Sequence, residues 1–254
     1  MVRSTLDATK DAFLGGRLQI CQPRKGYRAG VDPVLLAASV PAKSGQTVLE
    51  LGCGVGVAAL CLAARVSGLT LTGVEVQSDY AALARRNAED NKLPLDVILA
   101  DLRSLPADLR QRRFDHVIMN PPYFQKTTGS GSEDAGREVA LRGETALSDW
   151  LDIGARRLAP KGYLTLILRM ERLPEALDTL SGRLGSLVVC PIAGRSTKSP
   201  ERFLLQARQG GRAAFRMVPT LVMHDGTEHL TDSESYRPEV TDILRNGAAF
   251  SLPA

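Results

Sequence analysis

The stretch VLELGCGVG, residues 48–56, joins a predicted buried strand to a predicted helix through a turn that contains three glycines. Glycine allows a sharp backbone turn and lets a ligand approach the main-chain amides closely. A dinucleotide fingerprint would need its third glycine at position 57, but the chain has Val57 there and places the glycine one residue earlier, at Gly56. No Lys-Ser or Lys-Thr pair follows, which excludes a phosphate-binding P-loop. The turn therefore predicts a ligand site at a strand end, and its spacing argues against a bound pyrophosphate.

Strands and helices alternate along the chain on both sides of this turn. Strands are expected at residues 47–52, 69–76, 95–102, 114–120, 163–169, 186–193 and 202–208. Helices are expected at residues 55–66, 79–91, 147–158 and 174–184, with an earlier one from about Asp32. This alternation predicts a Rossmann-like, doubly wound α/β sheet with right-handed crossovers. We expect a single domain over residues 1–254, with an N-terminal extension of about residues 1–45 and a C-terminal extension of about residues 210–254.

The composition is that of a globular protein, with 44% hydrophobic and 24% charged residues among 254. A net charge of +4 permits a polyanionic partner without requiring one. The polar N-terminus predicts no signal peptide, and no apolar run approaches the roughly 18 residues that a membrane-spanning helix needs. The cysteines and the three isolated histidines have no metal-binding spacing, so no metal is expected. We interpret the cysteines as reduced thiols of a cytoplasmic protein: Cys21, Cys53, Cys61 and Cys190.

Three acidic residues, Glu50, Glu75 and Asp101, are expected at the carboxyl ends of three successive strands. Open α/β sheets bind ligands at that edge. Glu75 could accept both hydroxyls of a ribose, and Asp101 could accept from an adenine amino group. The alternative is that each acid only caps the helix that follows it. Three such acids after an offset glycine turn favour a nucleoside ligand.

This pattern resembles the S-adenosylmethionine fold of class I methyltransferases over most of residues 45–210. The resemblance implies a seven-stranded, mostly parallel sheet whose last strand is antiparallel, and S-adenosyl-L-methionine as cofactor. It also implies that Glu75 binds the ribose, that Asp101 lies near the adenine amine, and that Gly52 and Gly54 lie against the methionine part. The remaining expected cofactor contacts near these strand ends are Glu50, Val76, Leu102 and Asn120.

The stretch FDHVIMNPPYF, residues 114–124, ends a predicted strand with Asn120, two prolines and Tyr123. An amide or nucleobase amine is a poor nucleophile because its lone pair is delocalised, and two acceptors aimed at its N–H bonds would make it more sp³-like. The side-chain oxygen of Asn120 and the main-chain carbonyl of Pro121 could be those acceptors, since proline fixes the backbone there. The ring of Tyr123 offers a face for stacking. The alternative is an Asn-Pro turn that only ends the strand.

In a chain that also resembles the methyltransferase fold, the tetrapeptide Asn120-Pro121-Pro122-Tyr123 resembles the signature of amino methyltransferases. These enzymes act on adenine N6, cytosine N4 or the glutamine side chain. Enzymes that modify glutamine in release factors carry a longer domain before the glycine turn than the roughly 47 residues present here. Residues 15–41 instead resemble the bacterial tRNA1(Val) adenine-N6 methyltransferases, as do residues 198–210 and, more weakly, 221–247. This resemblance implies that Arg28, Gly30 and Asp32 line the methionine end. Pro33 departs from the small residue usual in that family and suits a first helical turn.

A tRNA substrate is therefore the expected partner, with no obligate protein partner indicated and the oligomeric state left open. A flipped-out base needs positive charge to hold the strand around it. The candidates are Arg24, Lys25, Arg28, Lys126, Arg137, Arg142, Arg195, Lys198 and Arg202, with Tyr27 interleaved in the first group. The polar segment 125–145 follows Tyr123 and could close on the target nucleotide. The alternatives are a glutamine N5 methyltransferase acting on a protein and a non-catalytic methyltransferase-like binding module.

Several other residues are expected to be structural. His116, Met119 and Trp150 should be packed in the core. Cys53, between two glycines of the turn, is expected to be a tolerated small side chain and not a nucleophile.

Overall fold

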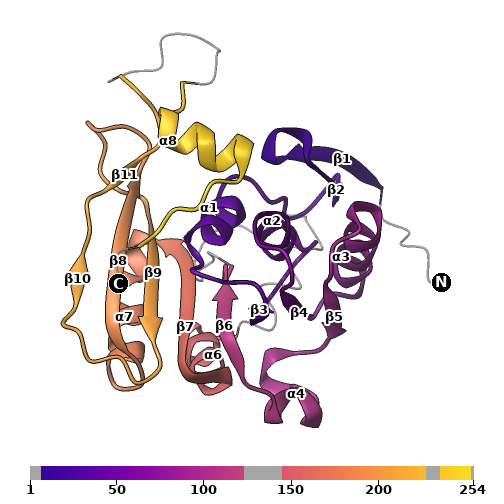
Figure 1. The fold of residues 1–254 in the computed structure, drawn as a ribbon, viewed down its shortest axis with the longest axis horizontal. Helices are drawn as coiled ribbons and strands as arrows, with labels where there is room; N and C mark the ends of the chain where they lie inside the picture. The colour runs from indigo at the N-terminus through magenta and orange to yellow at the C-terminus, as the bar shows by residue number, and fades with distance from the viewer. Residues whose placement is uncertain (1–6, 123–144, 227–234, 253–254) are drawn as a thin grey trace, which may run out of the picture.

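The computed structural model describes residues 7–122, 145–226 and 235–252 of the chain (Figure 1). Tyr123 and most of segment 125–145 lie outside the described residues. The strands are β1 (Ala8–Phe13), β2 (Leu18–Pro23), β3 (Thr47–Leu51), β4 (Thr70–Glu75), β5 (Asp96–Leu99), β6 (Phe114–Met119), β7 (Leu158–Arg169), β8 (Gly185–Ala193), β9 (Arg202–Arg208), β10 (Arg216–Met217) and β11 (Leu221–Val222). The helices are α1 (Asp32–Ser39), α2 (Val57–Arg65), α3 (Ser78–Asn91), α4 (Ala107–Gln111), α6 (Leu147–Arg157), α7 (Leu173–Ser181) and α8 (Pro238–Thr241). Short helical turns are η1 (Leu14–Gly16), η2 (Leu102–Ser104), η3 (Met170–Arg172) and η4 (Asp242–Asn246).

Within the described residues, nine strands form a central sheet in the order β10-β8-β9-β7-β6-β3-β4-β5, with β11 also beside β8. Neighbouring strands are parallel except β9, which runs antiparallel to both β7 and β8. The chain runs from β3 outward to β5 and then returns to β6 on the other side of β3, so the order reverses between β3 and β6. A ligand crevice is expected at such a switch point, outside the carboxyl ends of the strands.

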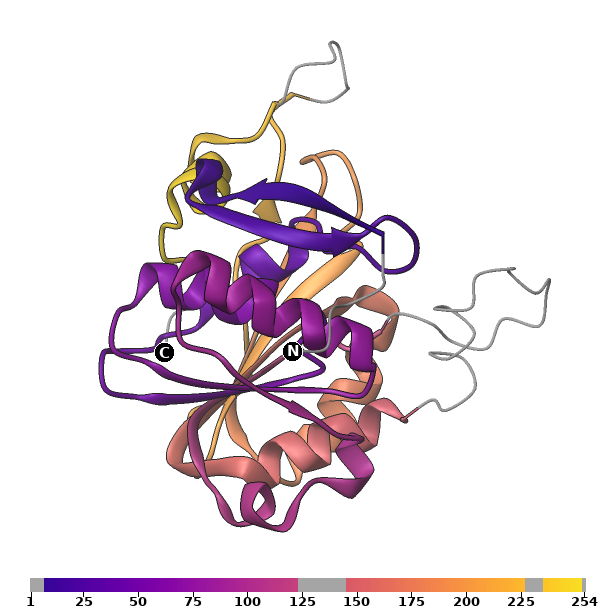
Figure 2. The ribbon, with the colours of Figure 1, turned by 90° about the vertical axis from the view of Figure 1, so that its right-hand side faces the viewer.

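Helices cover both faces of the sheet (Figures 1 and 2). On one face α1, α2 and α3 bury one apolar cluster, and on the other α4, α6 and α7 bury a second. Because both faces are covered, the central strands are near-continuous apolar runs, as in Val117, Ile118 and Met119, each with no exposed surface. Trp150 and His116 are also buried, which confirms the prediction that they are packed.

The seven strands predicted from the sequence are all present, and the last of them, β9, is antiparallel as expected. The structure adds β10 and β11, whose two residues each are too few to show a period of two. The prediction that a strand runs through residues 95–102 was wrong at its end, because β5 stops at Leu99. The amide of Ala100 still donates to the carbonyl of Glu75 at 2.9 Å, and Asp101 then caps η2.

The N-terminal residues form a two-stranded antiparallel hairpin of β1 and β2. Figure 2 shows this hairpin lying over α3. Helix α1 begins at Asp32 with Pro33 in its first turn, as predicted. In the part of the chain that the structure describes, no helix has the length and apolarity needed to cross a membrane.

Two asparagines of α3 fasten the hairpin to the body of the protein. The side chain of Asn87 accepts from the amide of Cys21 at 2.8 Å and donates to the carbonyl of Cys21 at 3.0 Å. Asn91 makes the same pair with Gln19, at 2.9 Å each. Residues four apart on a helix lie on one face, and so do residues two apart on a strand. The side-chain amides of Asn87 and Asn91 can therefore pair with the backbone of Cys21 and Gln19 as a neighbouring strand would.

Candidate active site

The glycine turn between β3 and α2 uses a backbone conformation that favours glycine at three positions: Gly52 (φ +65°), Gly54 (φ +54°) and Gly56 (φ +87°). At Gly52 a Cβ would also lie 2.4 Å from Cη2 of Trp150, so the indole ring needs the space. At Gly54 a Cβ would meet no atom within 4 Å, so the described structure leaves this part of the turn open to a ligand.

Glu50 is buried beneath this turn with 4% of its surface exposed. Its carboxyl group accepts from the amide of Ala59 in the first turns of α2, at 2.9 Å. Burial, and to a smaller extent the charge of Glu75, raise the pKa of Glu50 to about 8, while the bond from Ala59 lowers it. Glu50 thus holds the start of α2 and is largely protonated at neutral pH.

Glu75 connects the end of β4 to the glycine turn. Its Oε2 accepts from the amide of Gly54 and its Oε1 from the amide of Gln77, both at 2.9 Å. Burial raises the pKa of Glu75, and these two backbone bonds oppose the increase. Two bonds occupy only half of the acceptor positions of a carboxylate, so Glu75 retains acceptor capacity for a ligand.

The side chains at the ends of β4 and β5 differ in how far they are exposed. Val76 exposes 59% of its surface and Leu99 exposes 50%, so two apolar side chains lie uncovered at these strand ends. Leu102, a predicted cofactor contact, has its side chain buried in the core cluster beneath α6. Leu99 was not predicted as a site residue; its sequence signal is an apolar side chain on the last position of an edge strand.

The carboxylate of Asp101 is held by its neighbour Arg103. It accepts from the backbone amide at 2.8 Å and from the guanidinium at 3.1 and 2.7 Å. These bonds to Arg103 lower the pKa of Asp101, so it remains ionised. Asp101 is therefore set apart from the other two acids, which contact the glycine turn and α2.

The register of the sheet brings the remaining predicted residues level with one another. Met119 pairs with Leu51, and Leu51 pairs with Val74, so the next residue of each strand falls in one row. That row contains Asn120, Gly52 and Glu75 at the carboxyl edge.

Asn120 follows β6 and presents its carboxamide in a defined way. Its Nδ2 donates to the hydroxyl of Tyr27 at 3.4 Å. Its Oδ1 is buried and receives no hydrogen bond from any residue that the structure describes. An unsatisfied buried acceptor costs about 1–3 kcal/mol, and such a group marks a place where a ligand can supply the missing donor. Pro121 is buried directly after it.

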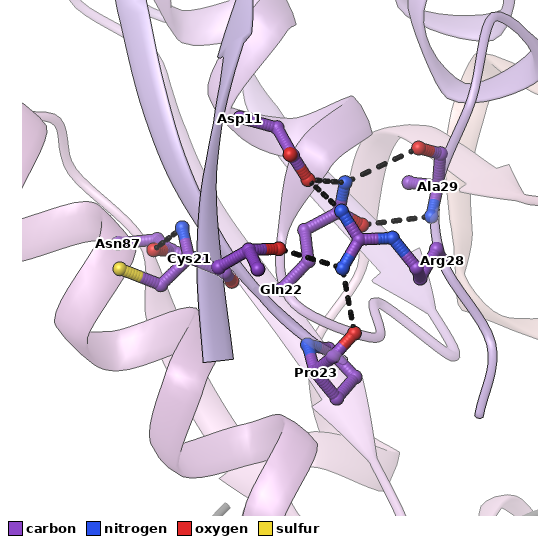
Figure 3. Close-up of polar contacts among 8 residues, drawn as sticks. Asp11, Cys21, Gln22, Pro23, Arg28, Ala29 and Asn87 are labelled. Atoms are coloured by element: carbon purple, nitrogen blue, oxygen red, sulfur yellow. Dashed lines mark hydrogen bonds and ion pairs between the residues drawn. The ribbon is translucent and has the colours of Figure 1, made fainter. Parts of the chain in front are cut away.

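Arg28, expected at the methionine end of the cofactor, is turned onto the hairpin. Figure 3 shows its guanidinium between Asp11 and Pro23. It forms an ion pair with Asp11 and donates to the carbonyl of Pro23 at 2.7 Å and to the hydroxyl of Thr9 at 2.8 Å.

Asp32 and Gly30 lie between the hairpin and α1. Asp32 is the first residue of α1 and forms an ion pair with Arg202 of β9. Gly30 is exposed, and a Cβ there would meet no atom within 4 Å.

The basic residues predicted to contact RNA fall into separate groups. Lys25 and Lys198 are exposed, and Arg24 is exposed but paired with Asp7. Arg195 is buried and donates to the carbonyl of Asp225 and the hydroxyl of Ser235, which leaves it little surface for a phosphate. Lys126, Arg137 and Arg142 lie outside the described residues.

The four cysteines are buried and free of disulfides. Burial, together with the nearby carboxyls of Glu50 and Glu75, raises the pKa of Cys53 well above its ordinary value, so the thiol stays protonated as expected for a structural residue. Among the described residues, no group of three His, Cys, Asp or Glu side chains is placed to hold a metal ion.

A family model for the methyltransferase small domain matches residues 29–171, the segment that contains the glycine turn, both buried acids and Asn120. The chain belongs to this methyltransferase family. This confirms the sequence-based assignment to the class I methyltransferases.

Individual relatives agree with this assignment. The chain is 31% identical over 245 residues to the tRNA1(Val) (adenine(37)-N6)-methyltransferase of Porphyromonas gingivalis, covering 90% of this chain and 91% of that protein. It is 32% identical over 189 residues to the protein of the same name from Shewanella halifaxensis, covering 72% and 74%. A crystal structure of a predicted O-methyltransferase from Agrobacterium tumefaciens superposes with a TM-score of 0.71 and 28% identity, covering 88% of this chain and all of that one. The fold is also that of the Thermus thermophilus 16S rRNA N2 G1207 methyltransferase solved with AdoMet and guanosine, at a TM-score of 0.56, 20% identity and coverage of 82% and 52%.

Proposed function

We propose that this methyltransferase transfers a methyl group from S-adenosyl-L-methionine to an exocyclic amine, N6 of an adenine in tRNA. The observation that carries the proposal is the buried Oδ1 of Asn120, an acceptor without a donor among the described residues, level with Gly52 and Glu75 at the switch point of the sheet.

The described residues fit the cofactor. When bound, S-adenosyl-L-methionine supplies an electrophilic methyl group on a sulfonium. Glu75 would accept the ribose hydroxyls with its free lone pairs, and the open space at Gly54 would admit the methionine part. Val76 and Leu99 would give the adenine ring apolar surfaces at the strand ends. The carboxylate of Asp101 would accept from the adenine amine in addition to its bonds with Arg103.

The acceptor amine would be prepared by the chain's own oxygens. Asn120 Oδ1 and the Pro121 carbonyl would each accept one N–H of the amine, which localises the nitrogen lone pair toward the methyl group. The reaction then requires alignment of the two reactants more than a strong general base. Tyr123 would stack on the planar base, and the proton would leave to water after transfer.

The choice of tRNA rests on the relatives, since the proteins from Porphyromonas and Shewanella are named tRNA1(Val) (adenine(37)-N6)-methyltransferases. The exposed Arg24 and Lys25 beside Tyr27 would provide charge for the phosphates around the flipped base. A tRNA acceptor supports a cytoplasmic location for the enzyme. The oxygen acceptor suggested by the name of the Agrobacterium protein suits the site less well, because a hydroxyl has one hydrogen where Asn120 and Pro121 offer two acceptors.

Transfer of a radiolabelled methyl group tests the proposal, with bulk tRNA and a peptide release factor offered in parallel. We expect label in tRNA, recovered as N6-methyladenosine by nucleoside mass spectrometry. Asn120→Ala should lower the rate by about 10²–10³-fold, the loss typical for a group that stabilises the transition state. Cofactor affinity, measured by calorimetry, should fall by much less than the rate, because Asn120 is one of several expected cofactor contacts and its Oδ1 acts mainly in the transition state.

The other outcomes have distinct meanings. Label in the release factor alone would replace the tRNA assignment with glutamine methylation. Cofactor binding without label in either acceptor would favour a non-catalytic module.

A further inference from the structure

We propose that Tyr27 is a positioning residue that sets the orientation of the Asn120 carboxamide, so that its oxygen and not its nitrogen faces the acceptor amine. This inference rests on the proposed function and concerns a residue that sequence reasoning assigned only to an RNA-binding surface.

The contact geometry carries the first step. A carboxamide rotated by half a turn exchanges an acceptor for a donor, and only one of the two orientations can receive an N–H from an amine. The hydroxyl of Tyr27 accepts from Nδ2 at 3.4 Å, while Oδ1 is buried without a donor among the described residues.

The hydroxyl of Tyr27 faces Asn120 as a neutral group. Tyr27 exposes 52% of its surface. The burial of its remaining surface, and after it the nearby carboxyls of Asp32 and Glu50, raise the pKa of Tyr27 to about 12, so the hydroxyl keeps its hydrogen at physiological pH. In the structure its oxygen accepts from Nδ2 of Asn120.

The backbone of Tyr27 is fixed from both sides, unlike that of an ordinary surface residue. On one side the hydroxyl of Tyr80 donates to the carbonyl of Tyr27 at 3.1 Å. Gly26 permits this approach, since it has φ +96° and a Cβ there would lie 2.8 Å from the Tyr80 oxygen.

On the other side, the two residues after Tyr27 are fastened to the hairpin (Figure 3). The guanidinium of Arg28 bonds to the carbonyl of Pro23 and pairs with Asp11. The amide of Ala29 donates to the Gln22 side chain at 2.8 Å, and Gln22 donates to Asp11 at 2.8 Å. The hairpin therefore presents Tyr27 to Asn120 from a rigid base.

A double-mutant cycle tests the proposal. Asn120→Asp replaces the carboxamide with a carboxylate whose two oxygens are both acceptors, so no neighbour is needed to orient it. We expect Tyr27→Phe to lower kcat by about tenfold in the Asn120 enzyme, within the usual range of couplings between contacting residues. In the Asn120→Asp background the same change should lower kcat less than about twofold. KM for the cofactor should not change.

A matched control is Tyr163→Phe, since Tyr163 contacts His116 and Arg208 through its ring, which phenylalanine retains. This variant should have wild-type kcat. Equal losses from Tyr27→Phe in both backgrounds would assign Tyr27 a merely structural role and overturn the inference, as would wild-type kcat for Tyr27→Phe.

If the Asn120→Asp enzyme is inactive, a measurement that does not depend on turnover still tests the inference. In ¹⁵N-labelled protein, the side-chain amide hydrogens of Asn120 should exchange with water at least about threefold faster in Tyr27→Phe than in the wild type, because one hydrogen bond is lost. Unchanged exchange would overturn the inference. If the wild type failed to methylate tRNA but showed this change in exchange, the proposed function would fail while the Tyr27–Asn120 pair stood.

Discussion

The glycine turn and the β1–β2 hairpin both border the candidate active site, and they meet at one side chain, Asn87, which donates to Val55 of the turn at 3.0 Å and bonds to Cys21 of the hairpin. The chain builds them differently. The turn takes its shape from its own backbone, through glycines with positive φ at positions 52, 54 and 56. The hairpin takes its position from side chains of α3 that are more than 60 residues away in the sequence, with a separation of 66 for Asn87 and Cys21.

This difference indicates how each region fails. A substitution in the turn acts on the residue replaced, through its dihedral angles and the atoms directly above it. A substitution that releases the hairpin acts at a distance, since the loop carrying Tyr27 depends on the placement of β2. The turn should therefore be sensitive to single methyl groups, and the hairpin to the loss of specific hydrogen bonds.

The largest effect is expected from Gly52→Ala. The added Cβ would lie 2.4 Å from the rigid indole of Trp150 and would occupy an unfavourable φ, which together should destabilise the protein by about 3–5 kcal/mol. Urea unfolding followed by tryptophan fluorescence measures the change.

Gly54→Ala is the matched control, because it has a similar φ but no atom within 4 Å of the new Cβ. It should cost only about 1–2 kcal/mol from backbone strain. Equal losses for the two variants would show that the contact with Trp150 does not matter.

Asn87→Ala should have the next largest effect, on the hairpin side of the comparison. It leaves the Cys21 amide, the Cys21 carbonyl and the Val55 carbonyl without their partner in a buried setting. We expect a loss of about 2–3 kcal/mol in the free energy of unfolding and faster hydrogen exchange at the Cys21 amide.

Asn91→Ala provides the comparison within the same helix. Its bonds to Gln19 are only partly buried, so water can replace them and the loss should be about 1 kcal/mol. If Asn91→Ala lowered the free energy of unfolding more than Asn87→Ala, Asn87 would not be the residue that connects the glycine turn to the hairpin.

The smallest expected effect is the pH dependence of stability that comes from Glu50, which is buried beneath the glycine turn. The pKa of Glu50 is raised from 4.5 to about 8 in the folded protein, so between these values the folded state holds a proton that the unfolded state has released. Stability is therefore lost as the pH rises through this window. Between pH 7 and 8 the wild type should lose about 1 kcal/mol relative to Glu50→Gln, which keeps an acceptor for the Ala59 amide without a titrating group.

Measuring between pH 7 and 8 separates the contribution of Glu50 to the pH dependence of stability from that of the buried His116. Burial lowers the pKa of His116 from 6.5 to about 4, so its contribution to stability is lost as the pH falls below 6.5 and is nearly constant above pH 7. Parallel stability curves for the wild type and Glu50→Gln from pH 7 to 8 would rule out a raised pKa for Glu50.

Some features of this protein follow from the sequence alone because they are properties of short segments. The glycine spacing in residues 52–56 dictates a tight turn, and apolar runs such as Val117-Ile118-Met119 dictate buried strands. In a sheet with right-handed crossovers, the carboxyl ends of these strands lie at one edge, so the sequence places Asn120, Gly52 and Glu75 there.

Other features were decided only by the tertiary structure, because they join residues that are distant in the chain or compete for the same group. Asn120 meets Tyr27 across a separation of 93 residues, which no local pattern encodes. Arg28 pairs with Asp11 across 17 residues, since an ionised side chain takes the partner that packing brings within reach. The sequence thus determined which chemistry stands at the strand ends, and the packed structure decided which of those groups remain free to face a ligand.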